Sequence, residues 1–139
     1  MAIEGSKQQQ QAGRIRLGMV GGGQGAFIGA VHRIAARIDD QFDLVAGALS
    51  SDPARAKASA AEIGIAPDRA YGSFEDMARA EAARPDGIEA VSIVTPNHMH
   101  APAAKAFLAA GIHVICDKPI TTTVDEARER VELGKTSGK

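Results

Sequence analysis

Hydrophobic positions along the chain alternate between two spacings. Short apolar runs at 14–20, 42–49, 88–94 and 112–116 are typical of buried strands. Between these runs, apolar residues recur with the 3.6-residue period of helices that lie on a sheet. A further short strand is expected around 69–71, which brings the predicted number of strands to five.

The first helix is predicted to begin at Phe27. Its apolar positions are expected to face the sheet, and they are Phe27, Ile28, Val31, Ile34, Ala35 and Ile38. Helices are also predicted over 53–63, 73–83 and 100–110, and a last helix follows Thr123.

Local signals place the ends of these helices. Asp52 before Pro53 has the pattern of an N-cap followed by proline at the first helical position. Thr123 and Glu126 have the spacing of a capping box. Strands that alternate with helices of this length predict a parallel sheet with right-handed crossovers. The predicted fold is therefore α/β, a doubly wound parallel sheet of Rossmann type over residues 14–139.

Composition narrows the class of protein further. The length of 139 residues suits one compact domain. With a net charge of −1 and no run of lysines or arginines, neither nucleic acid nor an anionic membrane is an expected partner. Residues 1–13 are polar and are expected to form a disordered leader. Because they contain no apolar core, they do not have the pattern of a secretion signal, and we expect a cytoplasmic protein.

A glycine-rich segment directly after the first strand is the strongest chemical feature. It fits the pattern G-x-G-x-x-A and leads into the first helix. Glycines let the backbone approach a pyrophosphate, and the helix N-terminus supplies free N–H groups and a partial positive charge. The predicted cofactor-binding residues here are Gly21, Gly22, Gly23, Gln24, Gly25, Ala26, Phe27 and Ile28.

The length of this loop leaves one point open. If Gly29 is the glycine that packs closely between helix and strand, the loop is three residues longer than the compact fingerprint. The identity of the N–H groups that face the phosphates then stays open.

The end of the second strand is where an acidic residue commonly binds the ribose of NAD. This chain has Ser50 and Ser51 there, followed by Asp52, which we favour as a helix cap over a ribose ligand. Uncharged serines tolerate a 2′-phosphate, and Arg55 could pair with it. The cofactor is therefore NAD or NADP, with NADP slightly favoured.

Two further motifs follow the third and fourth long strands. Thr95, Pro96, Asn97 and His98 come after the run at 88–94, and Asp117, Lys118 and Pro119 come after the run at 112–116. The carboxyl ends of parallel strands are where open α/β sheets bind ligands. Lys118 offers a mobile cation that would suit proton transfer at a carbinol, which makes it the candidate catalytic residue.

Three segments resemble the glucose–fructose oxidoreductase/inositol dehydrogenase (Gfo/Idh/MocA) family: MVGGGQGAFIGAVHR, VTPNHMHAPAAKAFLAAGIHV and CDKPITTTVDEA. The resemblance implies an N-terminal Rossmann domain and a second domain, absent from this chain, that binds sugars or polyols and builds a homo-oligomer. It places Lys118 near the nicotinamide and a cis bond before Pro119. Asp117 stands where the family usually has glutamate, which shortens the reach of the acid.

The predicted function is that of an NAD(P)-dependent oxidoreductase fragment, which binds the cofactor for hydride transfer at a secondary alcohol or ketone. The fragment alone is expected to be inactive. A non-enzymatic nucleotide-sensing or scaffold domain is the alternative, but it has no need for the Asp117-Lys118-Pro119 motif.

The remaining candidate groups are assigned structural roles. His98 and His100 lack a third ligand with suitable spacing, so no metal site is predicted, and they are expected to line the cleft or cap the following helix. His32 is expected to pack or form a hydrogen bond. Cys116 is expected to be a buried, unreactive thiol.

Overall fold

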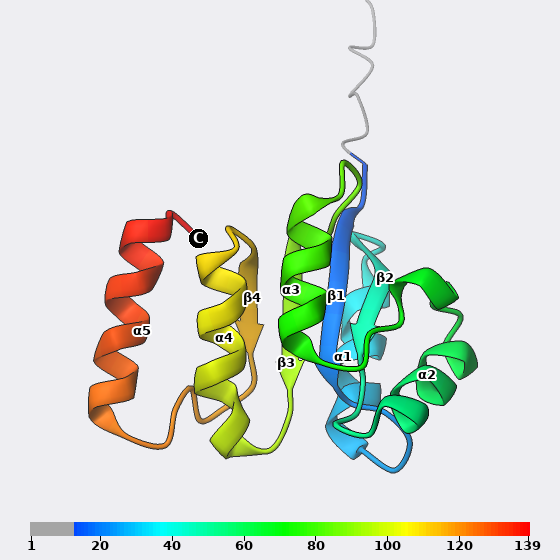
Figure 1. The fold of residues 1–139 in the computed structure, drawn as a ribbon, viewed down its shortest axis with the longest axis horizontal. Coiled ribbons are helices and arrows are strands. Elements are labelled where there is room, and N and C mark those ends of the chain that lie inside the picture. The colour runs from blue at the N-terminus through cyan, green and yellow to red at the C-terminus, as the bar shows by residue number, and fades with distance from the viewer. Residues whose placement is uncertain (1–12) are drawn as a thin grey trace, which may run out of the picture.

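The computed structural model describes residues 13–139, so the predicted leader lies outside the described residues except for Gly13. Its centre is a parallel sheet in the order β2-β1-β3-β4 (Figure 1). The strands are β1 (Ile15–Gly21), β2 (Phe42–Ala48), β3 (Ala90–Val94) and β4 (His113–Cys116). The chain moves outward from β1 to β2 and then outward from β3 to β4 on the other side. This reversal confirms the doubly wound α/β fold.

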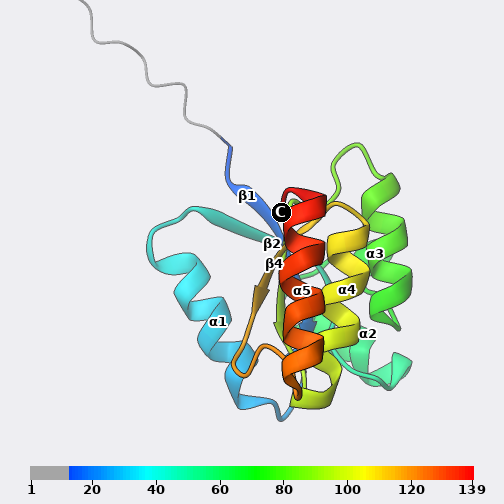
Figure 2. The same cartoon turned by 90° about the vertical axis from the view of Figure 1, so that its left-hand side faces the viewer.

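Helices cover both faces of the sheet. One face carries α1 (Phe27–Ile38), and the other carries α3 (Phe74–Ala83) and α4 (His100–Ala109), as Figure 2 shows. The remaining helices are α2 (Pro53–Glu62) and α5 (Val124–Ser137), and α5 packs beside α4. Within the described part of the chain, no helix is long and apolar enough to span a membrane.

The predicted caps are confirmed. The Asp52 carboxylate accepts the backbone N–H groups of Ala54 at 2.9 Å and Arg55 at 3.3 Å at the start of α2. Thr123 and Glu126 form a capping box at the start of α5. Because each cap links groups at most three residues apart, the local sequence is sufficient to specify it.

The main core lies between the sheet and the helices α3 and α4. Met77, Val91, Ile93 and Phe107 are completely buried there. Every residue of β3 is buried, since this strand lies inside the sheet and is covered on both faces.

A buried ion pair joins α3 to Arg69, in the turn that precedes this helix. The Arg69 guanidinium bonds to both carboxylate oxygens of Glu81, which is almost completely buried. Glu81 also accepts the Tyr71 hydroxyl at 2.7 Å and the Ile88 backbone N–H at 3.1 Å. Burial, followed by the hydrogen bond to Glu81, raises the pKa of Tyr71 to about 12. Every oxygen of the carboxylate therefore has a partner, as a buried charge requires.

The prediction of a strand around 69–71 is wrong. Its only pairing in the sheet is a single bridge between Ala70 and Gly47. A 3-10 turn occupies Pro67–Arg69 immediately before it, and Ser73 caps α3 immediately after it. These two local structures leave room for one paired residue, so the sheet has four strands.

The expected orientation of α1 is also wrong. Most of its large apolar side chains are exposed, with Phe27 at 83%, Ile34 at 56% and Ile38 at 80%. Ile28 is half-buried, and Gly29 is the buried residue of the helix. At about 100° per residue, the stripe formed by the exposed residues and Val31 lies roughly 170° around the helix from Gly29. Because Gly29 packs against the glycine loop, most of the apolar stripe points away from the sheet, while Val31 lines a pocket together with the strand residues Phe42 and Ile115.

Candidate nucleotide-binding site

The candidate site lies at the carboxyl edge of β1 and β3, where the winding of the sheet reverses. Gly21, the last residue of β1, pairs with Val94, the last residue of β3. A Cβ added to Gly21 would lie 3.0 Å from the backbone nitrogen of Thr95, so the two following loops are in contact. The glycine loop and the Thr95 turn thus form one surface, as the position of both at strand ends predicts.

Gly29 is the close-packing glycine of this site. A Cβ at Gly29 would lie 2.4 Å from the Cα atom of Gly22 and 2.7 Å from its carbonyl oxygen. Gly22 itself has a φ of 77°, in the left-handed region that favours glycine. The loop is therefore three residues longer than the compact fingerprint, which is the alternative that the sequence left open.

Several N–H groups of the loop are already used inside the protein. The N–H of Gly23 donates to Leu49, that of Ala26 donates to Gly23, and that of Gln24 donates to the Ser59 hydroxyl. The first turn of α1 differs, because Ala26 at the N-cap has no side-chain oxygen and makes no side-chain cap bond. The N–H groups of Phe27 and Ile28, in the first turn of α1, are therefore available to an anion.

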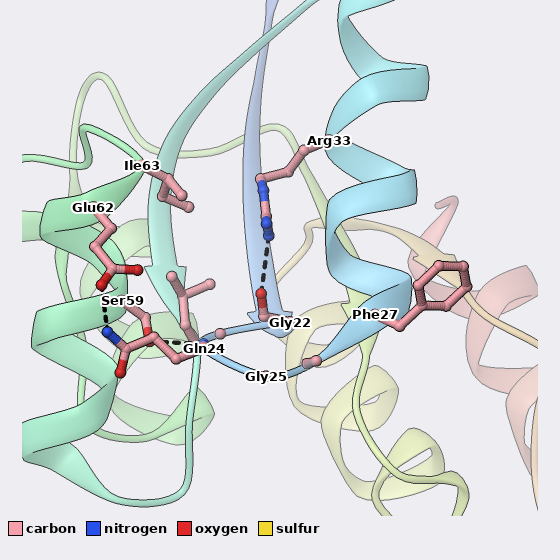
Figure 3. A pocket seen from close by; sticks show the side chains of 11 residues that line it. Gly22, Gln24, Gly25, Phe27, Arg33, Ser59, Glu62 and Ile63 are labelled. Atoms are coloured by element: carbon pink, nitrogen blue, oxygen red, sulfur yellow. Dashed lines mark hydrogen bonds between the residues drawn. The ribbon is translucent and has the colours of Figure 1, made fainter.

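Two cavities meet at the glycine loop. The smaller one, of about 300 Å³, lies between α1 and α2 (Figure 3). Across it, Arg33 donates to the Gly22 carbonyl at 2.9 Å, and the Gln24 amide bonds to the Glu62 carboxylate. The aromatic ring of Phe27 points away from this loop (Figure 3).

The larger cavity, of about 560 Å³, extends from the glycine loop past the end of β2 to the turn after β3. It brings together most of the residues predicted to bind the cofactor: Gly21, Gly22, Gly23, Gln24, Ala26, Ser50, Ser51, Arg55, Thr95, Pro96 and His98. Gly25 and Phe27 line the smaller cavity.

Four predicted residues line neither cavity: Ile28, Asn97, Asp117 and Lys118. Ile28 packs against the cluster around Met19, and the Lys118 side chain is exposed. The peptide bond between Lys118 and Pro119 is cis, as the resemblance implied.

Residues at the start of α3 were missed by the sequence reasoning. Gly72, Ser73, Phe74 and Glu75 line the larger cavity opposite the glycine loop. They follow Tyr71, whose N–H donates to the Gly47 carbonyl of β2 at 2.8 Å. This long-range pairing places them, and the only local signal was the N-cap pattern at Ser73.

The histidines have different roles. His98 lines the larger cavity, as expected. His100 neither lines it nor caps α4, because its buried ring contacts the carbonyl oxygens of Thr95 and Pro119. The His32 ring lies 2.8 Å from the Ser92 hydroxyl, which confirms the expected hydrogen bond. Burial raises the pKa of the half-buried Cys116 thiol, in keeping with an unreactive group.

One buried polar atom at the site has no partner. The Thr95 Oγ1 atom is inaccessible to solvent and makes no hydrogen bond within residues 13–139. A buried hydroxyl without a partner is destabilising, and such atoms are rare in folded proteins. Its residue lines the larger cavity, so a ligand amide there would supply the missing bond. The site therefore fits a dinucleotide at both the phosphate loop and the opposite end.

Comparison with known proteins agrees with this geometry. Residues 15–139 match the Gfo/Idh/MocA family, described as an oxidoreductase family with an NAD-binding Rossmann fold. The chain is 44% identical over 126 residues to the uncharacterized oxidoreductase YfiI of Bacillus subtilis, covering 90% of this chain and 32% of that protein.

Solved structures show the same likeness. An inositol dehydrogenase homologue from Azotobacter vinelandii, complexed with NADH and myo-inositol, has a TM-score of 0.90 and 43% identity, and the match covers 92% of this chain and 34% of the other. An oxidoreductase from Sinorhizobium meliloti has a TM-score of 0.83 and 61% identity, with 88% and 34% covered.

The chain thus spans about a third of the length of these relatives. Their shared fold, the glycine loop at the end of β1 and the match over residues 15–139 lead to one conclusion. This chain belongs to the Gfo/Idh/MocA oxidoreductase family, and it contains that family's NAD-binding Rossmann fold.

Proposed function

We propose that the larger cavity binds NAD or NADP along its length, as part of an oxidoreductase that acts on a sugar-like or polyol-like secondary alcohol or ketone. One observation carries the proposal. A single cavity connects a loop suited to phosphate, the serines at the end of β2, and a turn with an unpartnered buried hydroxyl. When bound, the dinucleotide supplies a hydride donor or acceptor at its nicotinamide ring.

The phosphate end of the proposed site depends on backbone groups. The N–H groups of Phe27 and Ile28 would donate to the pyrophosphate, assisted by the partial positive charge at the start of α1. Glycines at 21–23 permit this approach because no Cβ projects into the loop.

The opposite end depends on side chains after β3 and β4. The Thr95 hydroxyl would orient the nicotinamide amide, and Lys118 would hold or accept the proton of the substrate hydroxyl. Support comes from the exposure of the Lys118 side chain at the carboxyl edge of the sheet. It also comes from the inositol dehydrogenase homologue, whose structure contains NADH and myo-inositol.

At the adenosine end, the proposal includes either cofactor. The Asp52 carboxylate caps α2, while Ser50, Ser51 and Arg55 line the cavity, and Arg55 has no ion-pair partner among residues 13–139. Arg55 would pair with the 2′-phosphate of NADP. The substitution Arg55→Ala is then expected to weaken NADPH binding about tenfold and to leave NADH binding unchanged.

A second domain is also part of the proposal. In a full-length protein it would bind the substrate, complete the active site and support a homo-oligomer. The exposed stripe on α1 and an apolar pocket of about 370 Å³ beside it, lined in part by Val31, Phe42 and Ile115, would be covered by that domain. The 139-residue chain would then bind cofactor without turning over substrate. Steady-state dehydrogenase activity of this chain would contradict that expectation.

Calorimetric titration with NADH and NADPH tests the cofactor site directly. Gly25→Ala and Gly64→Ala form a matched pair, since both glycines have a φ of 80° and open space where a Cβ would be added. Both variants should lose similar stability because alanine is strained in this conformation. Only Gly25 lies at the candidate site, so only Gly25→Ala should lose affinity, by about tenfold or more.

Two results would contradict the proposal. If the wild-type chain binds neither dinucleotide, the assigned function is wrong. If the two glycine variants bind with equal affinity, the glycine loop does not hold the phosphates.

A further inference from the structure

His100 joins the two turns that carry the candidate chemistry. It is the first residue of α4, and only 1% of its surface is exposed. Its Nε2 atom is 2.9 Å from the Thr95 carbonyl oxygen, and its Nδ1 atom is 2.6 Å from the Pro119 carbonyl oxygen. One buried ring thus bridges the turn after β3 and the turn after β4.

The chemistry of these two contacts restricts the state of the ring. Carbonyl oxygens only accept hydrogen bonds, and a neutral imidazole has one N–H group. In the neutral ring, one nitrogen lone pair would face an oxygen lone pair at hydrogen-bond distance. The imidazolium form donates to both oxygens, which satisfies every polar atom of the contact.

The position at a helix start acts against a positive charge, because the N-terminus of α4 carries a partial positive charge itself. Burial of the ring also opposes a positive charge, because a buried cation loses its hydration. In either protonation state the ring lies within hydrogen-bond distance of both carbonyl oxygens and bridges the two turns.

We propose that His100 is a positioning residue: its ring bridges the Thr95 and Pro119 carbonyl oxygens and so holds Lys118 beside the Thr95 turn. Lys118 directly precedes Pro119, so a tether on the Pro119 carbonyl limits where the lysine ammonium can reach. This inference rests on the proposed function, because positioning has a purpose only if the nicotinamide lies between the two turns.

Binding of two ligands by the 139-residue chain separates positioning from packing. NADH reaches both turns, whereas ADP-ribose contains the pyrophosphate but no nicotinamide. His100→Leu keeps an apolar side chain in the buried space and removes both ring nitrogens. It should lower NADH affinity about five- to tenfold and leave ADP-ribose affinity within about twofold, as expected for the loss of contacts at one end.

Phe107→Leu is the matched control, because Phe107 is completely buried on the same helix and belongs to the main core. It should destabilise the chain while leaving the ratio of the two affinities unchanged. An unchanged ratio in His100→Leu, or an equal change in both variants, would overturn the inference.

A spectroscopic measurement on the wild-type chain does not depend on any variant folding. In an NMR experiment, the His100 ring N–H should be hydrogen-bonded and protected from exchange with solvent. A ring N–H that exchanges as fast as that of an exposed histidine would overturn the bridge. If instead the wild-type chain binds ADP-ribose but not NADH, the proposed nicotinamide site fails while the ring measurement still tests the bridge.

Discussion

Replacement of Gly29 by alanine tests how α1 is joined to the glycine loop. The added Cβ would lie 2.4 Å from the Gly22 Cα atom and 2.7 Å from its carbonyl oxygen. Carbon atoms in contact normally stay about 3.5–4.0 Å apart, so the overlap exceeds an ångström. Both sides of the contact are backbone or fixed to it, so no rotamer change relieves it.

Two opposing effects set the expected size of the change. Alanine inside a helix is favoured over glycine by up to about 1 kcal/mol. Overpacking in a closely packed site typically costs about 1–3 kcal/mol, and rigid backbone places this site at the upper end. The expected net loss of unfolding free energy is about 1–2 kcal/mol, equivalent to a Tm lower by roughly 3–10 °C.

The same substitution should weaken cofactor binding. Movement of α1 away from Gly22 also moves the N–H groups of Phe27 and Ile28, which the proposed site aims at the pyrophosphate. We expect NADH and ADP-ribose affinities to fall together by about tenfold, because both ligands contain that group.

Gly134→Ala provides the matched control, since Gly134 is also inside a helix and a Cβ there would meet only the Lys139 carbonyl oxygen at 3.7 Å. It should stabilise the chain by up to about 1 kcal/mol without changing affinity. Thermal unfolding and calorimetric titration of both variants suffice. A Gly29→Ala protein as stable as Gly134→Ala, with wild-type affinity, would refute the close-packing role of Gly29.

Three further predictions concern single side chains. Thr95→Val removes the unpartnered buried hydroxyl, so it should keep or raise Tm, lower NADH affinity and spare ADP-ribose affinity; weaker binding of both ligands would argue against a nicotinamide role. Glu81→Gln leaves the buried Arg69 with only the exposed Asp86 carboxylate, 3.6 Å away, as a counter-charge. Urea unfolding should show a loss of up to about 3–5 kcal/mol, compared with less than about 1 kcal/mol for Asp76→Asn at an exposed ion pair. Hydrogen bonds from the Thr122 side chain and then from Thr123 lower the pKa of Glu126. The Glu126 carboxylate therefore stabilises the folded chain at neutral pH, and this contribution is lost as the pH falls through its folded pKa. Glu126→Gln should therefore reduce the loss of Tm between about pH 6 and pH 3, and an identical pH dependence in both proteins would contradict this.

Some site residues are positioned by the strand that they directly follow, and others are positioned by contacts with segments far away in the sequence. The glycine loop and the Thr95 turn could be predicted because each directly follows an apolar strand, and parallel strands end at one edge of a sheet. The residues at the start of α3 could not, since they reach the cavity through the pairing of Tyr71 with β2. No pattern in the neighbouring sequence indicates that pairing.

The sequence by itself determined the helices, the caps and the four long strands, because periodicity and capping act within a few residues. It also contained the glycine loop and the motifs that identify the family. Only the tertiary structure decided the rotation of α1 and the contacts of His100. Gly29 contacts Gly22 across the loop, and this single close approach turns the apolar stripe of α1 outward, although periodicity alone pointed it to the sheet. Helical periodicity states which residues share a face, whereas packing between distant segments selects which face is buried.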